Sequence, residues 1–227
     1  ALAGSARIAL ECQPYFDKYI YIEKAKSKCT ALDMMSSEFP HLAGRIQIEN
    51  GDANEILLQI CKKNWKGHRA VLFLDPFGMQ VRWETMMAIA ETRGIDVWYL
   101  FPLGMGLNRL LVKNLAAMPA EFADKLDSVL GDRSWRTRFY RKIQESSLFE
   151  TVEFMEKDTS FEGMRDYMVE RLKSIFVGVA EYPVFLYNSK RNPMFLLCFA
   201  ASNPAGAKPA ISIANDLLRG IHEQNDH

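Results

Sequence analysis

The stretch that decides the fold is Ala70–Phe101, which begins AVLFLDPFG and ends IDVWYLF. Its first five residues form an apolar run of the length expected for a buried strand. Pro76 follows directly after Asp75; it has no backbone N–H and cannot continue a central strand, so the chain must turn there. Gly78 permits backbone conformations that other residues resist. Asp75, Pro76 and Phe77 are therefore presented at a strand end, where open α/β sheets bind ligands. The alternative is an ordinary Asp-Pro turn.

The composition limits the classes of protein to consider. The 227 residues suit one domain of ordinary size, and 28 basic residues balance 28 acidic ones. A net charge of zero argues against strong nonspecific attraction to nucleic acid but leaves a local basic patch open. The four cysteines lack C-x-x-C spacing and the four histidines lack ligand spacing, so we expect no metal site and a cytoplasmic protein with free thiols. No apolar run reaches the roughly 20 residues of a membrane helix. The cysteines are Cys12, Cys29, Cys61 and Cys198.

Strand and helix patterns alternate through the first hundred residues. Such alternation is typical of a parallel sheet covered by helices. We therefore expect an α/β fold, Rossmann-like, with a mostly parallel sheet in a single domain over residues 1–227. The predicted strands are 18–22, 45–49, 70–75 and 95–101, and the predicted helices are 1–11, 24–39, a segment that Asn54 caps and that runs to Cys61, and 82–93.

The pattern changes after Pro102. Residues 103–180 are charged and predominantly helical in pattern, with one candidate strand at 151–154, so we expect a helical insertion or elaboration within the domain. Two further strands, at 183–187 and 194–200, flank a polar loop and predict a C-terminal antiparallel hairpin. A final helix is expected at about 208–221.

Acidic residues follow three successive predicted strands. Glu23, Asp52 and Asp75 occupy these positions, and strand ends of a doubly wound sheet meet at one crevice. An ionised carboxylate is an acceptor only, so Glu23 suits two ribose hydroxyls and Asp52 suits an adenine amine, with the Ala53 N–H reaching a ring nitrogen. The alternative is that these acids cap helices and favour the helix dipole.

The most specific stretch of the chain is Phe73–Thr85, FLDPFGMQVRWET, followed by Asp96–Pro102, DVWYLFP. Three other motifs accompany it: Gly51–Asn54, Phe199–Pro204 and Gly4–Glu11. Together these motifs resemble the three-Cys-motif partner protein family of bacteria and archaea. The resemblance covers nearly the whole chain.

The resemblance implies a fold similar to class I methyltransferases, which use S-adenosylmethionine. It also implies a genomic partner, a protein with a three-cysteine motif that looks like a radical enzyme. Members usually have an earlier strand that ends in an acidic, glycine-containing loop around the methyl donor. The sequence contains no such loop, and Ala3-Gly4-Ser5, with a single glycine and no acidic residue, is too short to serve as one. This departure favours a non-catalytic partner as the second hypothesis.

Two further segments carry candidate substrate contacts. A loop with the spacing G-x-G follows the strand at 95–101, and it lacks the third glycine of a dinucleotide fingerprint. We expect Gly78, Asn108 and Arg109 to line a substrate pocket. The alternative for Asn108 is a structural role as a helix cap. The run at 133–142 interleaves basic and aromatic residues, which suits phosphate contacts by Arg136 and Arg138 with base stacking. The alternative is a solvated helix face over buried Trp135, Phe139 and Tyr140.

These observations support a methyltransferase-like protein acting on nucleic acid or another macromolecule. Glu23, Asp52 and Ala53 would hold the nucleoside of S-adenosylmethionine. Asp75, Pro76 and Phe77 would face the target, with the carboxylate orienting an attacking amine and the ring stacking on an extruded base. The alternatives are a non-catalytic partner of the three-cysteine-motif protein and a nucleotide-sensing module without turnover.

Overall fold

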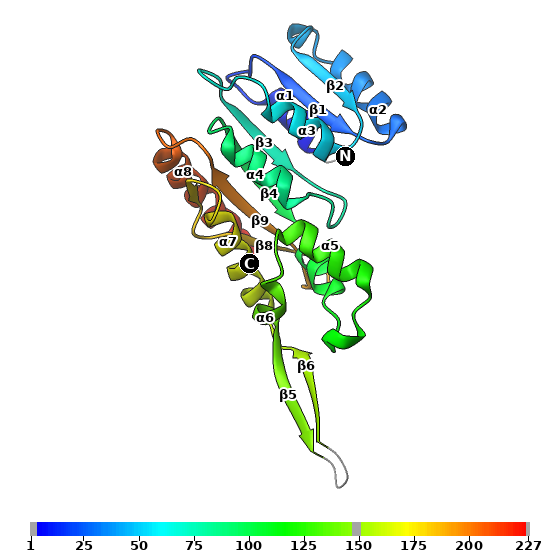
Figure 1. The fold of residues 1–227 in the computed structure, drawn as a ribbon. Coiled ribbons are helices and arrows are strands. Elements are labelled where there is room, and N and C mark those ends of the chain that lie inside the picture. Colours follow the sequence, from blue (N-terminus) through cyan, green and yellow to red (C-terminus); the bar gives the residue numbers. More distant parts are fainter. Residues whose placement is uncertain (1–3, 147–150, 226–227) are drawn as a thin grey trace. The chain divides into compact units, whose positions relative to one another are not determined.

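The computed structural model describes residues 4–146 and 151–225, and the contacts within the chain divide it into two units. Unit 1 comprises residues 1–62 and unit 2 comprises residues 63–227. Each unit is described by itself; both are coloured along the sequence in Figure 1. The chain is a mixed α/β protein with several sheets.

Unit 1 is built around two parallel strands. Strand β1 pairs with β2 in parallel, from Tyr19 opposite Ile46 to Glu23 opposite Asn50. The helices bury a small apolar cluster against the strands, with Leu10 and Leu42 almost completely enclosed. The elements are α1 (Ser5–Glu11), β1 (Tyr19–Glu23), α2 (Lys26–Ser37), the 3₁₀ turn η1 (Pro40–Leu42), β2 (Ile46–Asn50) and α3 (Ala53–Cys61).

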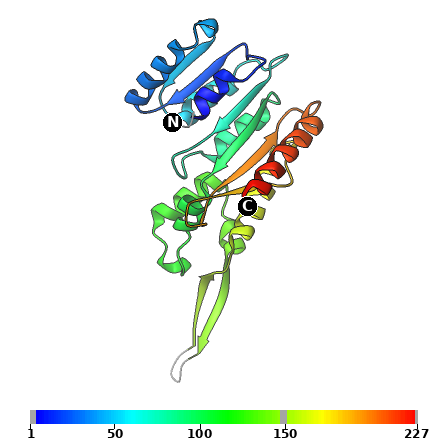
Figure 2. The same cartoon turned by 180° about the vertical axis from the view of Figure 1, so that it is seen from behind.

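Unit 2 contains a mixed sheet with the strand order β3-β4-β9-β7, and β8 also pairs with β9. Strand β3 runs parallel to β4, whereas β9 runs antiparallel to β4, β7 and β8. Figure 2 shows this sheet from behind. The sheet strands are β3 (Ala70–Leu74), β4 (Ile95–Phe101), β7 (Gly178–Val179), β8 (Val184–Tyr187) and β9 (Pro193–Ala201). The other elements are α4 (Trp83–Glu91), the π-helical turn η2 (Leu103–Asn108), the 3₁₀ turn η3 (Leu115–Ala117), α5 (Ala120–Leu130), α6 (Trp135–Phe139), β5 (Tyr140–Ser146), β6 (Thr151–Lys157), α7 (Phe161–Lys173) and α8 (Ala207–Asn225).

The pattern of burial along β4 explains its central position. Every second residue from Ile95 to Phe101 is buried, and the residues between them are half-buried. Such a strand has a covered face on each side and hydrogen-bonded neighbours at both edges, as expected for the interior of an α/β sheet. The predicted strands at 18–22, 45–49, 70–75 and 95–101 are confirmed to within one residue at most ends, as is the C-terminal antiparallel hairpin.

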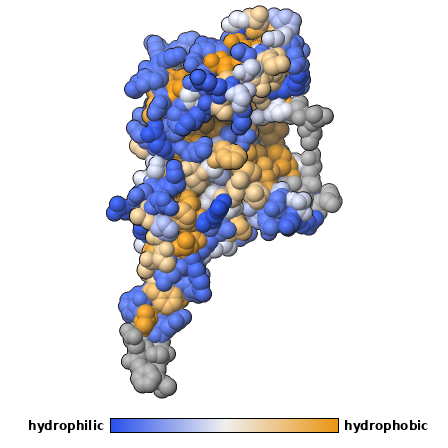
Figure 3. Space-filling model, turned by 90° about the vertical axis from the view of Figure 1, so that its right-hand side faces the viewer, coloured by the Kyte–Doolittle hydropathy of each residue, from blue (hydrophilic) through white to orange (hydrophobic). Residues whose placement is uncertain are grey.

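The segment 103–180 contains a β-hairpin as well as helices. Strands β5 and β6 pair antiparallel, from Tyr140 opposite Lys157 to Ser146 opposite Thr151. The hairpin that they form projects away from the remainder of unit 2 (Figure 1). The candidate strand at 151–154 is the first half of β6, whereas β5 was not predicted. The surface of the hairpin is a mixture of hydrophilic and apolar residues (Figure 3).

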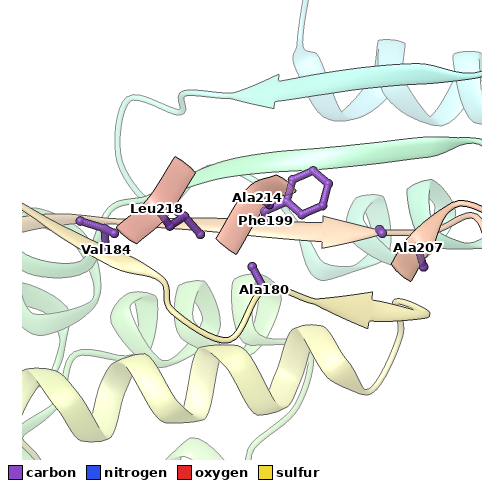
Figure 4. Packing of buried hydrophobic residues seen from close by; sticks show 7 residues of the cluster. Ala180, Val184, Phe199, Ala207, Ala214 and Leu218 are labelled. Carbon is purple, nitrogen blue, oxygen red and sulfur yellow. The ribbon is translucent and has the colours of Figure 1, made fainter. Parts of the chain in front are cut away.

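Helix α8 covers one face of the sheet over β9. Ala214 and Leu218 of α8 pack with Phe199 of β9, Val184 of β8 and Ala180 (Figure 4). Phe199 contacts Trp98 on β4, with ring centroids 4.8 Å apart, so this apolar layer extends from β9 onto β4. The helix therefore fixes the position of β9, and with it both ends of that strand.

Gly131 ends α5 at a point where no other residue fits. Its φ of +85° is in the left-handed region, as is common directly after a helix. A Cβ atom there would lie 2.1 Å from Cδ1 of the buried Trp83. The guanidinium of Arg171 from α7 also lies over that indole, 4.5 Å from the ring centroid, and its Nε donates to the Leu130 carbonyl at 2.9 Å. Helices α4, α5 and α7 therefore meet at Gly131.

We predict that Gly131→Ala lowers the free energy of unfolding by about 2–4 kcal/mol, because the left-handed backbone and the overlap with Trp83 each carry a cost. Urea unfolding followed by circular dichroism measures it. Gly220→Ala is the matched control: Gly220 lies within α8, and a Cβ atom there meets nothing within 4 Å. It should raise stability by up to about 1 kcal/mol. Equal midpoints for Gly131→Ala and the wild type would contradict this account of the α5 end.

Candidate functional site

The turn after β3 holds Phe77 in solvent. The backbone N–H of Gly78 donates to the Pro76 carbonyl at 2.8 Å, and the N–H of Gln80 donates to the Gly78 carbonyl at 2.8 Å. Gly78 has a φ of +98°, which confirms that glycine is needed at this position. Asp75 is exposed, and the Phe77 side chain is 85% exposed. An aromatic ring this exposed buries little apolar surface and so contributes little to folding, and it is accessible to a ligand.

The turn after β4 is fixed from a distance by a lysine. Lys157 Nζ donates to Asn108 Oδ1 at 2.6 Å and to the carbonyls of Asn108 and Leu111 at 3.3 Å. Burial lowers the pKa of the Lys157 ammonium group. Asn108, a predicted substrate contact, thus uses its side-chain oxygen within the fold, whereas Arg109 is exposed. Lys157 was not predicted as a functional residue, because its partners Asn108 and Leu111 lie 49 and 46 residues away in the sequence and no local motif connects them.

Parallel pairing brings these two turns to one edge of the sheet. Because β3 and β4 run in the same direction, the Asp75–Gly78 turn and η2 both follow the carboxyl ends of their strands. Gly104 in η2 lies against β9: a Cβ atom there would be 1.9 Å from the Pro193 carbonyl oxygen. The segments that hold Asp75, Phe77 and Arg109 therefore both begin at the carboxyl edge of unit 2, and Gly106 of η2 lies against Met79 of the first segment.

The two predicted cofactor acids lie at the carboxyl edge of the β1–β2 pair in unit 1, where each also serves the local fold. Glu23 Oε1 accepts a hydrogen bond from the Ala25 N–H at 2.8 Å, and Lys28 Nζ lies 3.7 Å from Glu23 Oε2. Asp52 Oδ1 accepts from the backbone N–H of Asn54 at 2.9 Å and from its side-chain amide at 3.2 Å. Both acids therefore stabilise the start of the following helix.

Asp52 is the N-cap of α3, and the prediction that Asn54 is the cap was wrong. The Asp carboxylate takes this role because it accepts the backbone N–H two residues further on. Partial burial raises the pKa of Asp52, but the hydrogen bonds from Asn54 outweigh it and leave the pKa below its ordinary value. Ala53, the first residue of α3, is exposed beside this carboxylate.

The basic run at 133–142 is neutralised within unit 2. Its residues pass from α6 into β5, so they do not form one helix face, although Trp135, Phe139 and Tyr140 are buried as the alternative interpretation expected. Each of its basic side chains has a carboxylate partner: Arg133 and Arg136 pair with Asp127, Arg138 with Glu170, Arg141 with Asp158, and Lys142 with Glu153.

Asp127 of α5 is the centre of these ion pairs. Its Oδ1 accepts from Arg136 Nη1 at 2.6 Å and from Trp135 Nε1 at 2.8 Å, and its Oδ2 accepts from Arg133 Nε at 3.2 Å. Arg136 also lies over the Trp135 ring, 4.3 Å from its centroid. Partial burial raises the pKa of Asp127, but the hydrogen bonds and positive charges of these donors lower it by more. The pKa of Asp127 therefore lies below the ordinary value for an aspartate. The predicted contact residues Arg136 and Arg138 thus have structural partners.

No protein-family model matches this chain, and no curated protein matches it. Within the described ranges, no three His, Cys, Asp or Glu side chains gather closely enough to hold a metal ion. Over the same residues, none of the helices combines the length and the apolar character needed to cross a membrane.

We predict that Asp127→Asn lowers the free energy of unfolding at pH 7 by about 2 kcal/mol, because the Arg136 and Trp135 donors lose a charged acceptor. The folded-state pKa of Asp127 is lower than the unfolded value of 3.8, so its contribution is complete above about pH 5 and disappears as the pH falls through the folded pKa. Urea unfolding between pH 7 and pH 2.5 should therefore show the difference narrowing below about pH 4.

The control for this experiment is Asp124→Asn, an exposed position on the same helix. It should change stability by less than about 0.5 kcal/mol at every pH. A wild-type advantage over Asp127→Asn that persists undiminished at pH 2.5 would show that the carboxylate charge is not what stabilises α6.

Proposed function

We propose that this chain is a Rossmann-like, S-adenosylmethionine-dependent methyltransferase of the three-Cys-motif partner type, acting on nucleic acid or another macromolecule. The observation that carries the proposal is the turn after β3, which holds Phe77 85% exposed beside Asp75 at the carboxyl edge of parallel strands. Ligands of α/β sheets bind at that edge. The sequence resemblance at Phe73–Thr85 falls on the same turn.

The chemistry assigned to this turn is positioning. The Asp75 carboxylate accepts hydrogen bonds from an attacking amine and orients its lone pair. Phe77 stacks on the planar ring that bears the amine, and an extruded base presents such a ring. Pro76 lies between these two residues and prevents the chain from continuing as a strand after Leu74, so both stay in the turn. Arg109 at the same edge adds a cation near the target.

The residues of unit 1 fit the nucleoside of S-adenosylmethionine in their chemistry. Glu23 would accept from ribose hydroxyls, Asp52 from the adenine amine, and the Ala53 N–H would donate to a ring nitrogen. A carboxylate has about four acceptor positions, so the bond from Ala25 to Glu23 leaves capacity for a ligand. When bound, the sulfonium of the group supplies the methyl, and carboxylates favour its positive charge.

We predict that Phe77→Ala leaves thermal stability unchanged but lowers methyl transfer about tenfold or more, since stacking on one base contributes about 1–3 kcal/mol. Transfer from radiolabelled S-adenosylmethionine into cellular RNA and DNA measures it. Ile213→Ala removes another exposed apolar side chain of unit 2, 62% exposed on α8, and should retain full activity. Equal methyl transfer by Phe77→Ala and Ile213→Ala would show that Phe77 does not contact the target.

We also predict that Asp52→Ser abolishes S-adenosylmethionine binding in isothermal titration while preserving stability, because serine still caps α3. Asp52→Ala should lose both the binding and about 1 kcal/mol of stability. The titrations are repeated at several temperatures, because a binding enthalpy that happens to be zero at one temperature would give no heat there even if the ligand binds. Absence of heat from the wild type at every temperature would contradict the methyltransferase proposal.

One observation favours the second candidate, a non-catalytic partner of the three-cysteine-motif protein. Both cofactor acids have structural roles, Glu23 toward Ala25 and Asp52 as the α3 cap, which would account for them without a ligand. Asp75→Ala separates the two functions: it should abolish methyl transfer and leave binding of the three-cysteine-motif protein intact. No methyl transfer from the wild type, together with intact binding of the three-cysteine-motif protein, would favour the partner role, whereas retained transfer by Asp75→Ala would remove Asp75 from the proposed site.

A further inference from the structure

The loop between β8 and β9 lies at the same edge of unit 2 as Asp75 and Phe77. Phe101 at the carboxyl end of β4 is opposite Leu196, and β9 runs antiparallel, so the residues before Pro193 extend beyond that end of β4. Tyr187 of β8 pairs with Pro193 and leads into the loop, residues 188–192. Figure 2 shows this loop near the segment that follows β4.

Hydrogen bonds from one asparagine hold the loop. Asn188 Oδ1 accepts from the backbone N–H of Lys190 at 2.9 Å and of Asn192 at 3.0 Å. The N–H of Arg191 donates to the Asn188 carbonyl at 2.9 Å. The side chains of Lys190 and Arg191 are exposed, so the loop presents two cations on an ordered backbone.

Arg191 occupies a backbone position that glycine or asparagine would fill at lower cost. Its φ is +56°, in the left-handed region, where hairpin loops usually have glycine. A residue with a Cβ atom is strained in this conformation, and such outliers cluster at binding sites. Arg93 shares this conformation, so the backbone alone assigns no role to Arg191; what distinguishes Arg191 is its place in the loop at the carboxyl edge of the sheet.

The charges of this edge are not neutralised by the fold. Over the described residues, Arg109, Lys190 and Arg191 form no ion pair with a carboxylate. The basic run at 133–142 differs, because all its basic residues are paired. Exposed aromatic rings accompany the unpaired cations: Phe77, and Tyr187, which is 49% exposed.

We infer that the carboxyl edge of unit 2 binds a single-stranded nucleic acid, with Lys190, Arg191 and Arg109 on its phosphates and Phe77 and Tyr187 on its bases. Strands lie about 4.8 Å apart, so β3 and β8 are about 14 Å apart across the sheet, a span of several nucleotides. Cations along the backbone and stacking aromatics are the general features of such sites. This inference rests on the proposed function and names its substrate class.

The experiment measures binding of a short fluorescein-labelled single-stranded RNA of mixed sequence to the full chain by fluorescence anisotropy. Arg191→Gly should weaken binding about fivefold at about 0.1 M salt and lower the slope of log K against log salt by about 0.7, the effect of one phosphate contact. Its midpoint of unfolding should not fall, because glycine adopts a positive φ at no cost.

Arg93→Gly is the matched control. Arg93 also has a positive φ, +50°, and is exposed, but it precedes β4 and lies at the opposite edge of the sheet. It should leave both the affinity and the salt slope unchanged. Lys190→Gln repeats the comparison with a substitution that does not alter the backbone; its control is Lys208→Gln, an exposed lysine in the first turn of α8, which follows the opposite end of β9.

Equal losses for Arg191→Gly and Arg93→Gly would overturn the inference, as would competition by polyglutamate as effective as that by unlabelled RNA. If S-adenosylmethionine binds but RNA does not, the inference fails while the methyltransferase proposal stands. If RNA binding depends on Arg191 and S-adenosylmethionine does not bind, the inference stands and the methyltransferase proposal fails.

Discussion

The hydrogen-bonded registers on the two sides of β4 determine where the functional candidates of unit 2 lie. Parallel pairing with β3 brings the Asp75–Gly78 turn to the carboxyl end of β4, and antiparallel pairing with β9 brings the β8–β9 loop to that same end. Helix α8 secures β9 through Leu218 and the apolar layer under it. Three distant parts of the sequence therefore meet at one edge of the sheet. The carboxyl ends of β3 and β4 lie at this edge because these strands are parallel, and the start of β9 lies there because β9 is antiparallel to β4.

Charged residues of this protein divide into those that the fold uses and those that it leaves exposed. Asp127 gathers Arg133, Arg136 and the Trp135 N–H, and it thereby attaches α6 to α5. Glu23 and Asp52 stabilise helix starts in unit 1, so their positions at strand ends have a structural reason that is compatible with ligand binding. A basic run in a sequence of balanced charge is thus a poor indicator of nucleic-acid contact, and unpaired cations at a sheet edge are a better one.

The sequence predicted the strands that are apolar or alternate regularly, because burial on a pleated surface imposes those patterns. It did not predict β5: Tyr140–Ser146 is mostly charged and polar, with no apolar alternation, and it follows a helical segment, so only pairing with β6 makes it a strand. The cap of α3 was assigned to Asn54 because both Asn and Asp suit that role. The Asp75–Gly78 turn was visible in the sequence, whereas Lys157 and Arg191 gain significance only through pairings between distant segments.

The central claim is that ligands bind at the carboxyl edge of the β3–β4 pair. Hydrogen–deuterium exchange of the full chain, with and without single-stranded RNA in the presence of S-adenosylmethionine, tests it most directly. The account predicts slower exchange in the Asp75–Gln80 turn, in the segment 103–109 and in the loop at 188–192, with no change at the amino edge around Arg93. Protection confined to residues 133–142, or to the exposed face of α8, would contradict it.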